Sequence, residues 1–467
     1  MSDEPENAMR KALLSVLLLL LPASARAQPP PPPAVAPATI TVPPPPPVSD
    51  PMLAPVPPPK RVLSSWPEAV TYLRARSTDL KIALDQVLQA EAATRIALAQ
   101  YLPSLTSTAA MTHQLITSSG IYISSSGASN STTTLSGNLQ LQQTVLNVQQ
   151  FDQISIDELN EDASRLSVDD KKRTLALSLA NQIVAVVTSE RSAEINRVGL
   201  KVALEQLEIT RRKQALGAAN GLDVVRAEQN AANARASLVS GDESLREARE
   251  ALGLALGIPE ETGVAPGINV NDLAQNAMES CRVVKNIDER PDIASARRAL
   301  DVAKRNLRNV YFAFLPTLNA TSTMTYFSPA PALGAPDPTW NVQGILTIPW
   351  FDGGVRYGNL RMARASQDIA AQNLESLRRQ AVIQVEQAQR QLGVAQTADK
   401  VATEQRDLAA QNDTMTQTAY MAGQGTSLEL VTASEAHRQA ELNLALADFN
   451  VVKARLLAVL ALATCPW

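Results

Sequence analysis

The chain has 467 residues, which is enough for two to four ordinary domains or one very elongated one. Its formal net charge is -4 and it has no evident basic patch, so the composition argues against nucleic acid as a partner. Aromatic residues make up only 4 %, which is low for a compact core of this length and suits long helices packed through small side chains.

The first 27 residues have the organisation of a secretory signal peptide. Arg10 and Lys11 give a charged start, residues 12–21 give an apolar run, and residues 25–27 give a small-x-small cleavage site. The apolar run is too short to cross a bilayer as a helix. A chain that carries an N-terminal lipid needs a cysteine as the first residue after the cleavage site. That residue is Gln28 here, so we expect no N-terminal lipid anchor.

Residues 28–60 are predicted to form a proline-rich, disordered tether. Residues 29–59 contain sixteen of the thirty prolines of the chain. Such a stretch forms no packed core of its own and favours extended, partly polyproline-II conformations. We therefore expect a spacer between the signal peptide and the folded part of the chain.

Long helices are predicted where proline is absent. The stretches after Pro103 and after Pro349 each run for more than a hundred residues without another proline, the residue that most strongly breaks helices. Residues 149–216 would form one helix of roughly 100 Å. Apolar residues at steps of three and four favour coiled-coil packing. These residues are Leu374, Leu377, Ala381, Val385, Ala388, Leu392 and Ala395, and later Leu444, Ala447, Val451, Ala454, Ala458 and Ala461.

The sequence contains an internal duplication. Residues 79–112 align without a gap on residues 292–325, and such self-similarity indicates one structural unit built twice. We predict a mainly α-helical fold in which each half runs helix, two strands, long helix, turn and return helix. The predicted parts are a first repeat at 61–260, with strands at about 104–116 and 132–147 and a turn at 217–221; a connector at 258–290; and a second repeat at 291–467, with strands at about 317–327 and 340–349 and a turn at 423–427.

The predicted strands alternate apolar and neutral polar residues. In residues 317–326, for example, Leu318, Met324 and Tyr326 alternate with threonines on the other face. A membrane sheet between lipid and water alternates in this way, and so does a soluble antiparallel sheet that covers a core. Four strands cannot close a barrel, since the smallest membrane barrels have about eight. A membrane sheet would therefore be shared, either by two copies with eight strands or by three copies with twelve.

The sequence carries no motif of a catalytic or nucleotide-binding site. Its only histidines and cysteines are His113, His437, Cys281 and Cys465, and their spacing matches no recognisable metal site. We therefore expect no enzyme activity and no cofactor. In an exported chain Cys281 and Cys465 either form one disulfide or remain two thiols, and the sequence leaves both alternatives open.

From about residue 62 to its C-terminus, the chain resembles the TolC-type outer-membrane factors, the outer-membrane efflux proteins of tripartite efflux pumps and type I secretion systems. The resemblance rests on the Leu-Pro-Ser/Thr-Leu strand starts at residues 102–105 and 315–318, the WFDGG segment at residues 350–354, the two G-x-x-x-x-L-D/E turns, the duplication and the signal peptide. It implies a homotrimer whose 12-stranded transmembrane β-barrel continues into a 12-helix α-barrel. Residues 258–290 and the chain ends would form a belt around the helices.

The resemblance also implies a function. The protein would be a passive exit duct for efflux or secretion, gated at the periplasmic tip of its helices, in the cell outer membrane with a long periplasmic extension. Its partners would be outer-membrane lipid, a periplasmic adaptor (membrane fusion protein) and an inner-membrane pump. The alternative is a soluble periplasmic coiled-coil adaptor or scaffold without a pore, since adaptors also carry signal peptides and long helical hairpins.

Alignment on the turn glycines assigns the gate of the family to Asp223, Tyr420 and Glu429. Some members place an arginine where this chain has Gly425, so the salt-bridge latch of that arginine is missing here. Asp223 and Glu429 also fit a purely local role, because helix N-termini favour negative charge. The residues that match the adaptor-contact region of the family also fit simple turn chemistry; they are Gly217, Asn220, Gly221, Gly423, Gly425, Thr426 and Ser427.

The WFDGG segment has its own physical interpretation. Asp352 is expected to cap the helix that follows, by accepting hydrogen bonds from its free backbone N–H groups. Gly353 and Gly354 are expected to let the chain swing from the strand into the helix. We assign no chemistry to this segment.

Overall fold

The computed structural model describes residues 47–113, 133–266, 272–328 and 338–467. The chain divides into two units, residues 1–44 and residues 45–467, and the description that follows concerns the second. The predicted signal peptide, the first part of the predicted tether and the outer ends of the first two predicted strands (114–116 and 132) lie outside the described residues.

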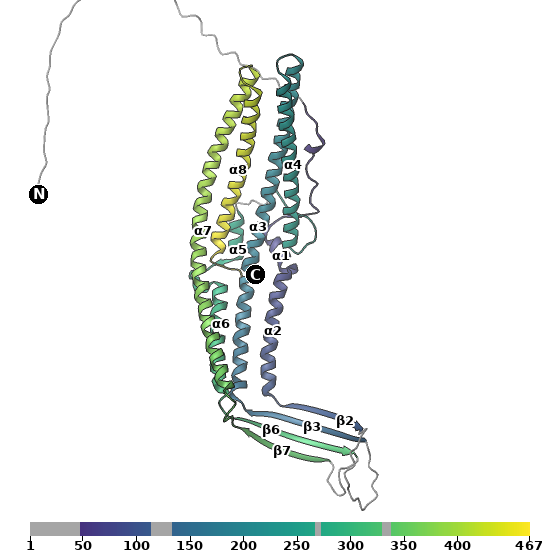
Figure 1. The fold of residues 1–467 in the computed structure, drawn as a ribbon, viewed down its shortest axis with the longest axis vertical. Coiled ribbons are helices and arrows are strands. Elements are labelled where there is room, and N and C mark those ends of the chain that lie inside the picture. The colour runs from purple at the N-terminus through teal and green to yellow at the C-terminus, as the bar shows by residue number, and fades with distance from the viewer. Residues whose placement is uncertain (1–46, 114–132, 267–271, 329–337) are drawn as a thin grey trace, which may run out of the picture. The chain divides into compact units, whose positions relative to one another are not determined.

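The first half of this unit ends in a long helical hairpin (Figure 1). Its central element, α3, is one uninterrupted helix of 68 residues, and Asn147 starts it by accepting a hydrogen bond from the backbone N–H of Gln150. The elements of this half are η1 (Pro51–Leu53), β1 (Arg61–Leu63), α1 (Trp66–Arg76), α2 (Thr78–Tyr101), β2 (Ser104–His113), β3 (Thr133–Leu146), α3 (Val148–Ala215) and α4 (Gly221–Ala255).

The second half repeats the order helix, two strands, long helix, return helix. Asp352 starts the long helix as expected, because its carboxylate accepts hydrogen bonds from the N–H groups of Gly354 and Arg356, each at 3.0 Å. Gly353 and Gly354 have φ angles of 67° and 93°, which glycine adopts without steric cost. The connector before this half contains β4 (Thr262–Val264), α5 (Leu273–Ser280), β5 (Arg282–Val283) and η3 (Ile287–Glu289). The elements of the second half are α6 (Pro291–Phe312), β6 (Thr317–Ser328), β7 (Thr339–Thr347), α7 (Val355–Met421), α8 (Ser427–Leu460) and β8 (Ala463–Thr464).

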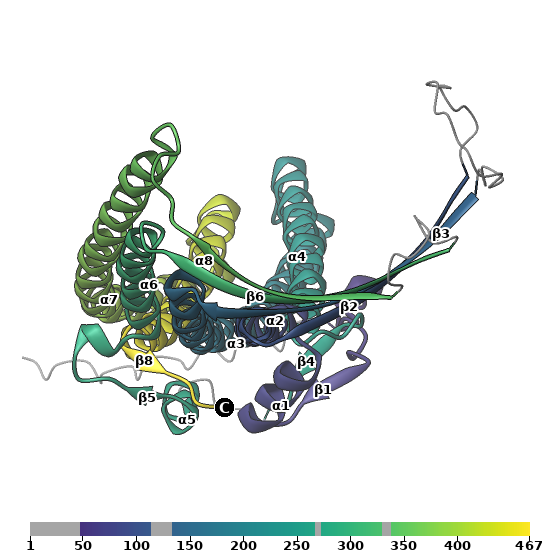
Figure 2. The ribbon, with the colours of Figure 1, turned by 90° about the horizontal axis from the view of Figure 1, so that it is seen from below.

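The four long strands form one antiparallel, curved sheet in the order β2-β3-β6-β7 (Figure 2). Its register places Leu139 beside Met324 and Met324 beside Trp340. No residue of these four strands is buried, and every residue of the edge strands β2 and β7 is exposed. The described part of the chain therefore provides no core beneath this sheet, as a soluble antiparallel sheet would require.

The helices pack around α3. It contacts α2 and α6 along one part of its length and α4 and α8 along another, while α7 packs against α8 and α6. Close approach depends on small residues, because Ala227, Ala231 and Ala234 of α4 face Leu200 and Leu207 of α3. Among the described residues, none of the helices combines the length and apolar character needed to cross a bilayer.

The described part of the predicted connector packs beside the middle of the long helices (Figure 1). β1 pairs in parallel with β4, and β5 pairs antiparallel with β8 near the C-terminus. Cys281, at the end of α5, and Cys465, after β8, form a disulfide. Of the two alternatives that the sequence left open, the structure has the paired one.

The prediction of a disordered tether over residues 28–60 is wrong for residues 47–60. These residues are ordered along the first hairpin, where Asp50 pairs with Arg235 and the carbonyl of Pro57 accepts a hydrogen bond from Arg249. Met52 and Leu53 pack against the apolar residues between α3 and α4. The proline-rich segment lacks a core of its own, as predicted, but it packs on a surface that the helices provide.

Candidate functional site

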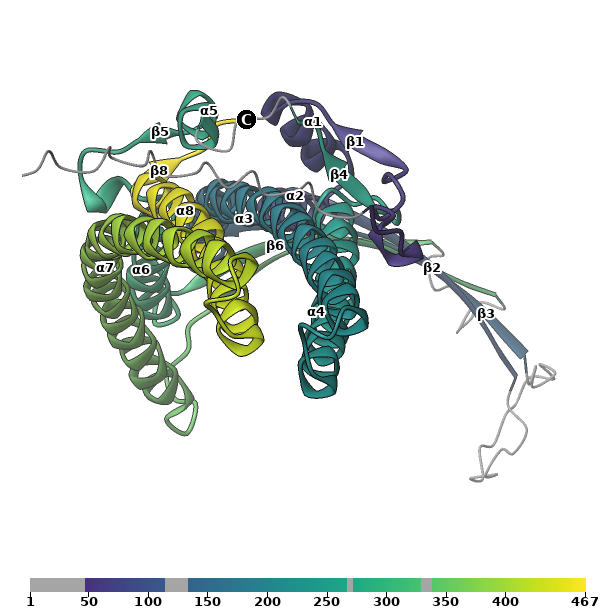
Figure 3. The ribbon, with the colours of Figure 1, turned by 90° about the horizontal axis from the view of Figure 1, so that it is seen from above.

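The turns of the two hairpins, seen end-on in Figure 3, have the same construction. The outgoing helix ends at a glycine with a left-handed backbone, with φ of 75° at Gly217 and 77° at Gly423. Glycine closes the last helical turn in this conformation without a Cβ clash. Asn220 and Thr426 then begin α4 and α8. Each residue of the first turn therefore matches the residue 206 positions later.

Asp223 and Glu429 hold these turns together. Asp223 accepts a hydrogen bond from the N–H of Asn220 at 3.2 Å, and the side chain of Asn220 accepts one from the N–H of Asp223 at 2.9 Å. Glu429 and Thr426 form the same reciprocal pair at 2.8 and 3.2 Å, an arrangement known as a capping box. The hydrogen bonds from the backbone and side chain of Thr426 lower the pKa of Glu429. Both carboxylates thus cap the start of their helix, which is the local role that negative charge at a helix N-terminus can have.

Replacing Asn220 or Thr426 with alanine is expected to weaken the first turn of α4 or α8 by about 1 kcal/mol, because an N–H group loses its acceptor. Amide hydrogen exchange over residues 221–225 or 427–431 should become about fivefold faster. Serine at either position keeps the accepting oxygen and is the matched control. Equal exchange rates in the alanine and serine variants would contradict this role of the caps.

Tyr420 is the gate candidate that joins the two hairpins. Its side chain is only 6 % exposed and lies against α3. Lys213 Nζ is 3.5 Å from the centre of the Tyr420 ring and donates a hydrogen bond to the Tyr420 carbonyl at 2.8 Å. The Tyr420 hydroxyl is 3.5 Å from Thr210 Oγ1. We call the contact among Thr210, Lys213 and Tyr420 the hairpin latch. Burial lowers the pKa of Lys213, so the ring and the carbonyl stabilise an ammonium group that has lost water.

Lys213 and Thr210 were not predicted as site residues. Lys213 follows Arg211 and Arg212 at the end of α3, where any of the three cations suits the helix dipole. The two arginines are exposed and form ion pairs on the surface, whereas Lys213 is partly buried. The available signal was the position of Lys213 four residues before the turn glycine, but the sequence does not show which cation faces the other hairpin.

Further polar contacts join α3 to α8. Gln206 donates a hydrogen bond to the Ser434 hydroxyl at 3.0 Å, and Arg438 donates one to the Asn196 side chain at 3.0 Å. These contacts and the hairpin latch are hydrogen bonds and a cation–ring contact between separate helices. Such contacts can be exchanged for water more readily than an apolar core.

The predicted partner-contact residues differ in accessibility. Gly217, Asn220, Gly221, Gly423 and Thr426 are exposed. Gly425 is half-buried, and a Cβ there would lie 3.0 Å from the backbone nitrogen of Tyr420, which explains a glycine in this place.

Ser427 differs from the other contact candidates because its side chain is buried, with 7 % exposed. It is the first residue of α8 and shares a helix face with the buried Leu430. Ser427 is therefore not accessible in this conformation, and its contact with an adaptor stays a prediction.

A groove of about 540 Å³ lies beside the turns, between α4 and α8. Both polar and apolar side chains line it, among them Arg226, Gln229 and Asn233 of α4 and Leu428 and Val431 of α8. It therefore lies between the return helices of the two hairpins.

A pair of carboxylates lies farther from the turns, on α7 and α8. Burial and the side-chain hydrogen bond with Asp399 raise the pKa of Asp448 to about 6, while Arg406 and Arg191 act in the opposite direction. One carboxylate oxygen of Asp399 is buried and has no hydrogen-bond partner among the described residues. A proton on this pair therefore stabilises the contact between the two helices.

The raised pKa predicts a pH dependence. The folded chain holds a proton on Asp448 more tightly than the unfolded chain does, so the stabilisation is complete below about pH 4 and is lost as the pH rises through about 6. Asp448→Asn should remove this dependence. The difference in Tm between the variant and the original chain should grow in favour of the variant from pH 4 to pH 7. Parallel Tm curves for the two proteins would contradict the assignment.

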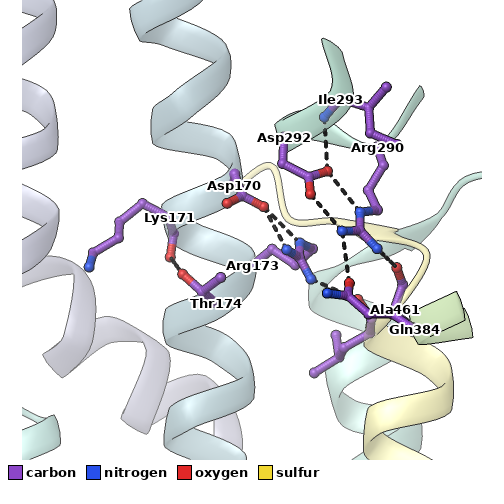
Figure 4. Close-up of polar contacts among 10 residues, drawn as sticks. Asp170, Lys171, Arg173, Thr174, Arg290, Asp292, Ile293, Gln384 and Ala461 are labelled. Carbon is purple, nitrogen blue, oxygen red and sulfur yellow. Dashed lines mark hydrogen bonds and ion pairs between the residues drawn. The ribbon is translucent and has the colours of Figure 1, made fainter. Parts of the chain in front are cut away.

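A second polar cluster, which we call the equatorial clamp, fixes the far end of α8 (Figure 4). Arg290 is 2 % exposed and binds Asp292 through two hydrogen bonds of 2.6 and 2.7 Å. It also donates to Gln384 of α7 at 3.0 Å and to the Ala461 carbonyl at 3.4 Å. Arg173 of α3 donates to the Leu460 carbonyl at 3.5 Å. Two arginines from different halves of the chain therefore occupy the carbonyl end of α8, where positive charge is favoured.

Each arginine of the clamp has a carboxylate partner, Asp292 for Arg290 and Asp170 for Arg173. Burial raises the pKa of Asp292, but the hydrogen bonds and the charge of Arg290, with the charge of Arg173, outweigh it and leave the pKa below its usual value. The Cys281–Cys465 disulfide binds the same C-terminal segment to the connector. The base of α8 is thus held by α3, α7 and the connector.

Among the described residues no group of three or more histidine, cysteine or acidic side chains is placed to hold a metal ion. His437 Nδ1 lies 3.1 Å from a carboxylate oxygen of Asp413 across the second hairpin, within hydrogen-bond distance. The candidate site that the described residues form consists of two turns, a latch, a groove and a clamp.

Comparison with known proteins identifies a matching protein family. The family model described as outer membrane efflux protein matches residues 70–258 and 284–462. The chain is 28 % identical over 241 residues to the cation efflux system protein CusC of Escherichia coli O6:H1, covering 50 % of this chain and 52 % of that protein. It is 24 % identical over 242 residues to the probable efflux pump outer membrane protein TtgC of Pseudomonas putida KT2440, covering 51 % and 49 %. The chain thus spans about half the length of these curated relatives.

Solved structures share the fold over a longer range. A crystal structure of CusC matches with a TM-score of 0.71 at 18 % identity, covering 84 % of this chain and 91 % of that chain. The outer membrane protein VceC of Vibrio cholerae matches with a TM-score of 0.69 at 17 % identity, covering 85 % and 95 %. At these identities the likeness concerns the arrangement of the backbone.

Proposed function

The chain belongs to the outer membrane efflux protein family, and on this premise we propose that it is a passive exit duct in the outer membrane, through which substrates leave the periplasm or an inner-membrane pump. Three copies would combine their strands into one 12-stranded barrel and their helices into one 12-helix tunnel. No bond is made or broken, and an energised partner drives transport.

The single observation that supports this proposal most is the four-stranded sheet. β2 pairs only with β3 and β7 only with β6 among the described strands, so the sheet has two open edges. Open edges in lipid leave backbone groups without hydrogen bonds, at a cost of several kcal/mol for each group. A β2 edge placed against the β7 edge of a neighbouring copy continues the antiparallel alternation and satisfies both. Twelve strands from three copies lie within the range of membrane barrels.

Aromatic side chains at the edge of the sheet support a membrane location. Trp340 of β7 is 76 % exposed, and Trp350 and Phe351, just before α7, are 86 % and 90 % exposed. Such exposure is unfavourable in water and normal at the boundary between lipid and water, where tryptophan is enriched. The WFDGG segment would then mark the level at which the barrel meets the helical tunnel.

The turns would form the periplasmic gate and the docking end. Tyr420 would hold the second hairpin to the first through the hairpin latch, with Asp223 and Glu429 keeping the turns in shape. A periplasmic adaptor would dock at the exposed turn residues Gly217, Asn220, Gly423 and Thr426 and in the groove between α4 and α8. Opening would require the latch to break while the equatorial clamp keeps the base of α8 in place.

Membrane fractionation tests the proposal. The protein should appear in the outer-membrane fraction as an oligomer that resists mild heating in detergent, and it should form pores in planar lipid bilayers. A free monomer in the periplasmic fraction would overturn the proposal in favour of a soluble adaptor, which neither the family match nor the uncovered sheet supports.

A further inference from the structure

The ordered residues 47–60 are fastened to α4 at two points. Arg235 donates hydrogen bonds to Asp50 from Nε at 3.1 Å and from Nη2 at 3.0 Å. Arg249 donates to the Pro57 carbonyl at 3.0 Å and is itself only 5 % exposed. The segment therefore has one ionic and one backbone anchor on the same helix.

The distance between the anchors fits an extended, proline-rich segment. Fourteen residues separate Arg235 from Arg249, a rise of about 21 Å and almost four turns, so both arginines lie on one face of α4. Seven residues separate Asp50 from Pro57. Pro51–Leu53 form the short helix η1, which rises about 2 Å per residue, and the extended residues around it rise about 3 Å each, so the segment spans roughly 18 Å. It therefore covers most of the interval between the two arginines, whose long side chains reach the two anchor points.

Apolar contacts complete the attachment. Met52, Leu53 and Leu204 all pack against the buried apolar residues between α3 and α4. Residues 47–49 line a groove together with Leu204, Leu207 and Glu208 of α3. The segment thereby contacts both helices of the first hairpin.

The second hairpin lacks the ionic anchor. At the offset of 206 residues that relates the two turns, Arg235 corresponds to Glu441 and Leu207 to Asp413, whereas Arg249 corresponds to another arginine, Arg455. Glu441 and Asp413 flank His437 at 3.7 and 3.1 Å. Two carboxylates at this place repel the carboxylate of Asp50, so the ionic anchor is specific to the first hairpin.

We propose that residues 47–60 are a strap that braces the first hairpin and closes this face of it to the helices of a partner protein. The idea of a helical partner rests on the proposed function, whereas the strap itself does not. Arg226, which lines the groove between α4 and α8, precedes Arg235 by nine residues and so lies on the opposite side of α4. The strap does not cover the groove between α4 and α8, so a partner helix can bind there but not on the face that the strap occupies.

Thiol labelling of the purified full chain tests the strap. Leu204→Cys places a thiol in the groove that residues 47–49 line. Ala410→Cys places one at the corresponding, equally half-buried position of the second hairpin. A bulky maleimide reagent should label Leu204→Cys slowly. Adding Asp50→Lys should raise that rate about tenfold, because it replaces the ion pair by repulsion. The rate at Ala410→Cys should not change.

The charge-swapped variant Asp50→Lys with Arg235→Asp should restore slow labelling of Leu204→Cys. Equal labelling with and without Asp50→Lys, or failure of the charge swap to restore protection, would overturn the strap. A rise at both thiols would indicate general loosening of the hairpins and would also overturn it. Labelling does not depend on transport, so this result and the fractionation result can fail separately.

Discussion

Tyr420→Ala is expected to raise the open probability and the single-channel conductance of the protein in planar lipid bilayers. The variant removes the ring beneath Lys213 and the hydroxyl near Thr210, while the turn glycine Gly423 is untouched. A partly desolvated cation–ring contact contributes about 1–2 kcal/mol. Losing it shifts the balance between closed and open hairpins by roughly tenfold.

Variants of the two partners separate the parts of the latch. Lys213→Met should act in the same direction as Tyr420→Ala, whereas Lys201→Met, an exposed lysine on the same helix, should have no effect. Tyr420→Phe should stay close to the original protein, because the ring remains and the hydroxyl contact is long, at 3.5 Å. Unchanged conductance in both Tyr420→Ala and Lys213→Met would show that the latch does not hold the closed state.

Asp292→Asn is expected to destabilise the folded chain by about 3–5 kcal/mol, the range found when one partner of a buried ion pair is removed. Arg290 would remain 2 % exposed with its charge uncompensated, since Gln384 and the Ala461 carbonyl supply only neutral acceptors. The measurement is the midpoint of chemical unfolding, followed by helical circular dichroism.

Asp301→Asn is the matched control for the clamp. Asp301 contacts Arg298 and Lys304 on the exposed side of the same helix, α6, with all three side chains at least 36 % exposed. Exposed pairs of this kind contribute at most about 1 kcal/mol. If Asp292→Asn shifted the midpoint no more than Asp301→Asn, Arg290 and Asp292 would not form the clamp described.

Backbone features were predictable from the sequence because they depend on local chemistry. Pro103 follows α2 by two residues, Gly217 and Gly423 close the long helices, and Asp352 starts α7. Because the two halves are duplicated, each local prediction made for one half applied to the other half as well. The family resemblance, stated from these motifs, is confirmed by the family match.

The side-chain contacts of the site were not predictable in the same way. Lys213 and Tyr420 are 207 residues apart, and the sequence gives no reason to prefer Lys213 over its two arginine neighbours. In the sequence Arg290 cannot be distinguished from a surface arginine, because its burial depends on contacts with α7 and the end of α8. Residues 47–60 became ordered because α4 carries two arginines at a matching interval, which the composition of the proline-rich segment does not reveal.

The most direct test of the shared barrel is a cross-link between copies. Cysteines at Thr108 of β2 and Asn341 of β7 lie on the two open edges, which are three strand spacings, about 14 Å, apart within one copy. A bis-maleimide reagent shorter than this should therefore join only neighbouring copies. The account predicts a cross-linked ladder in native membranes that ends at the covalent trimer. A ladder that ends at the dimer, that extends beyond three copies or that never forms would contradict it.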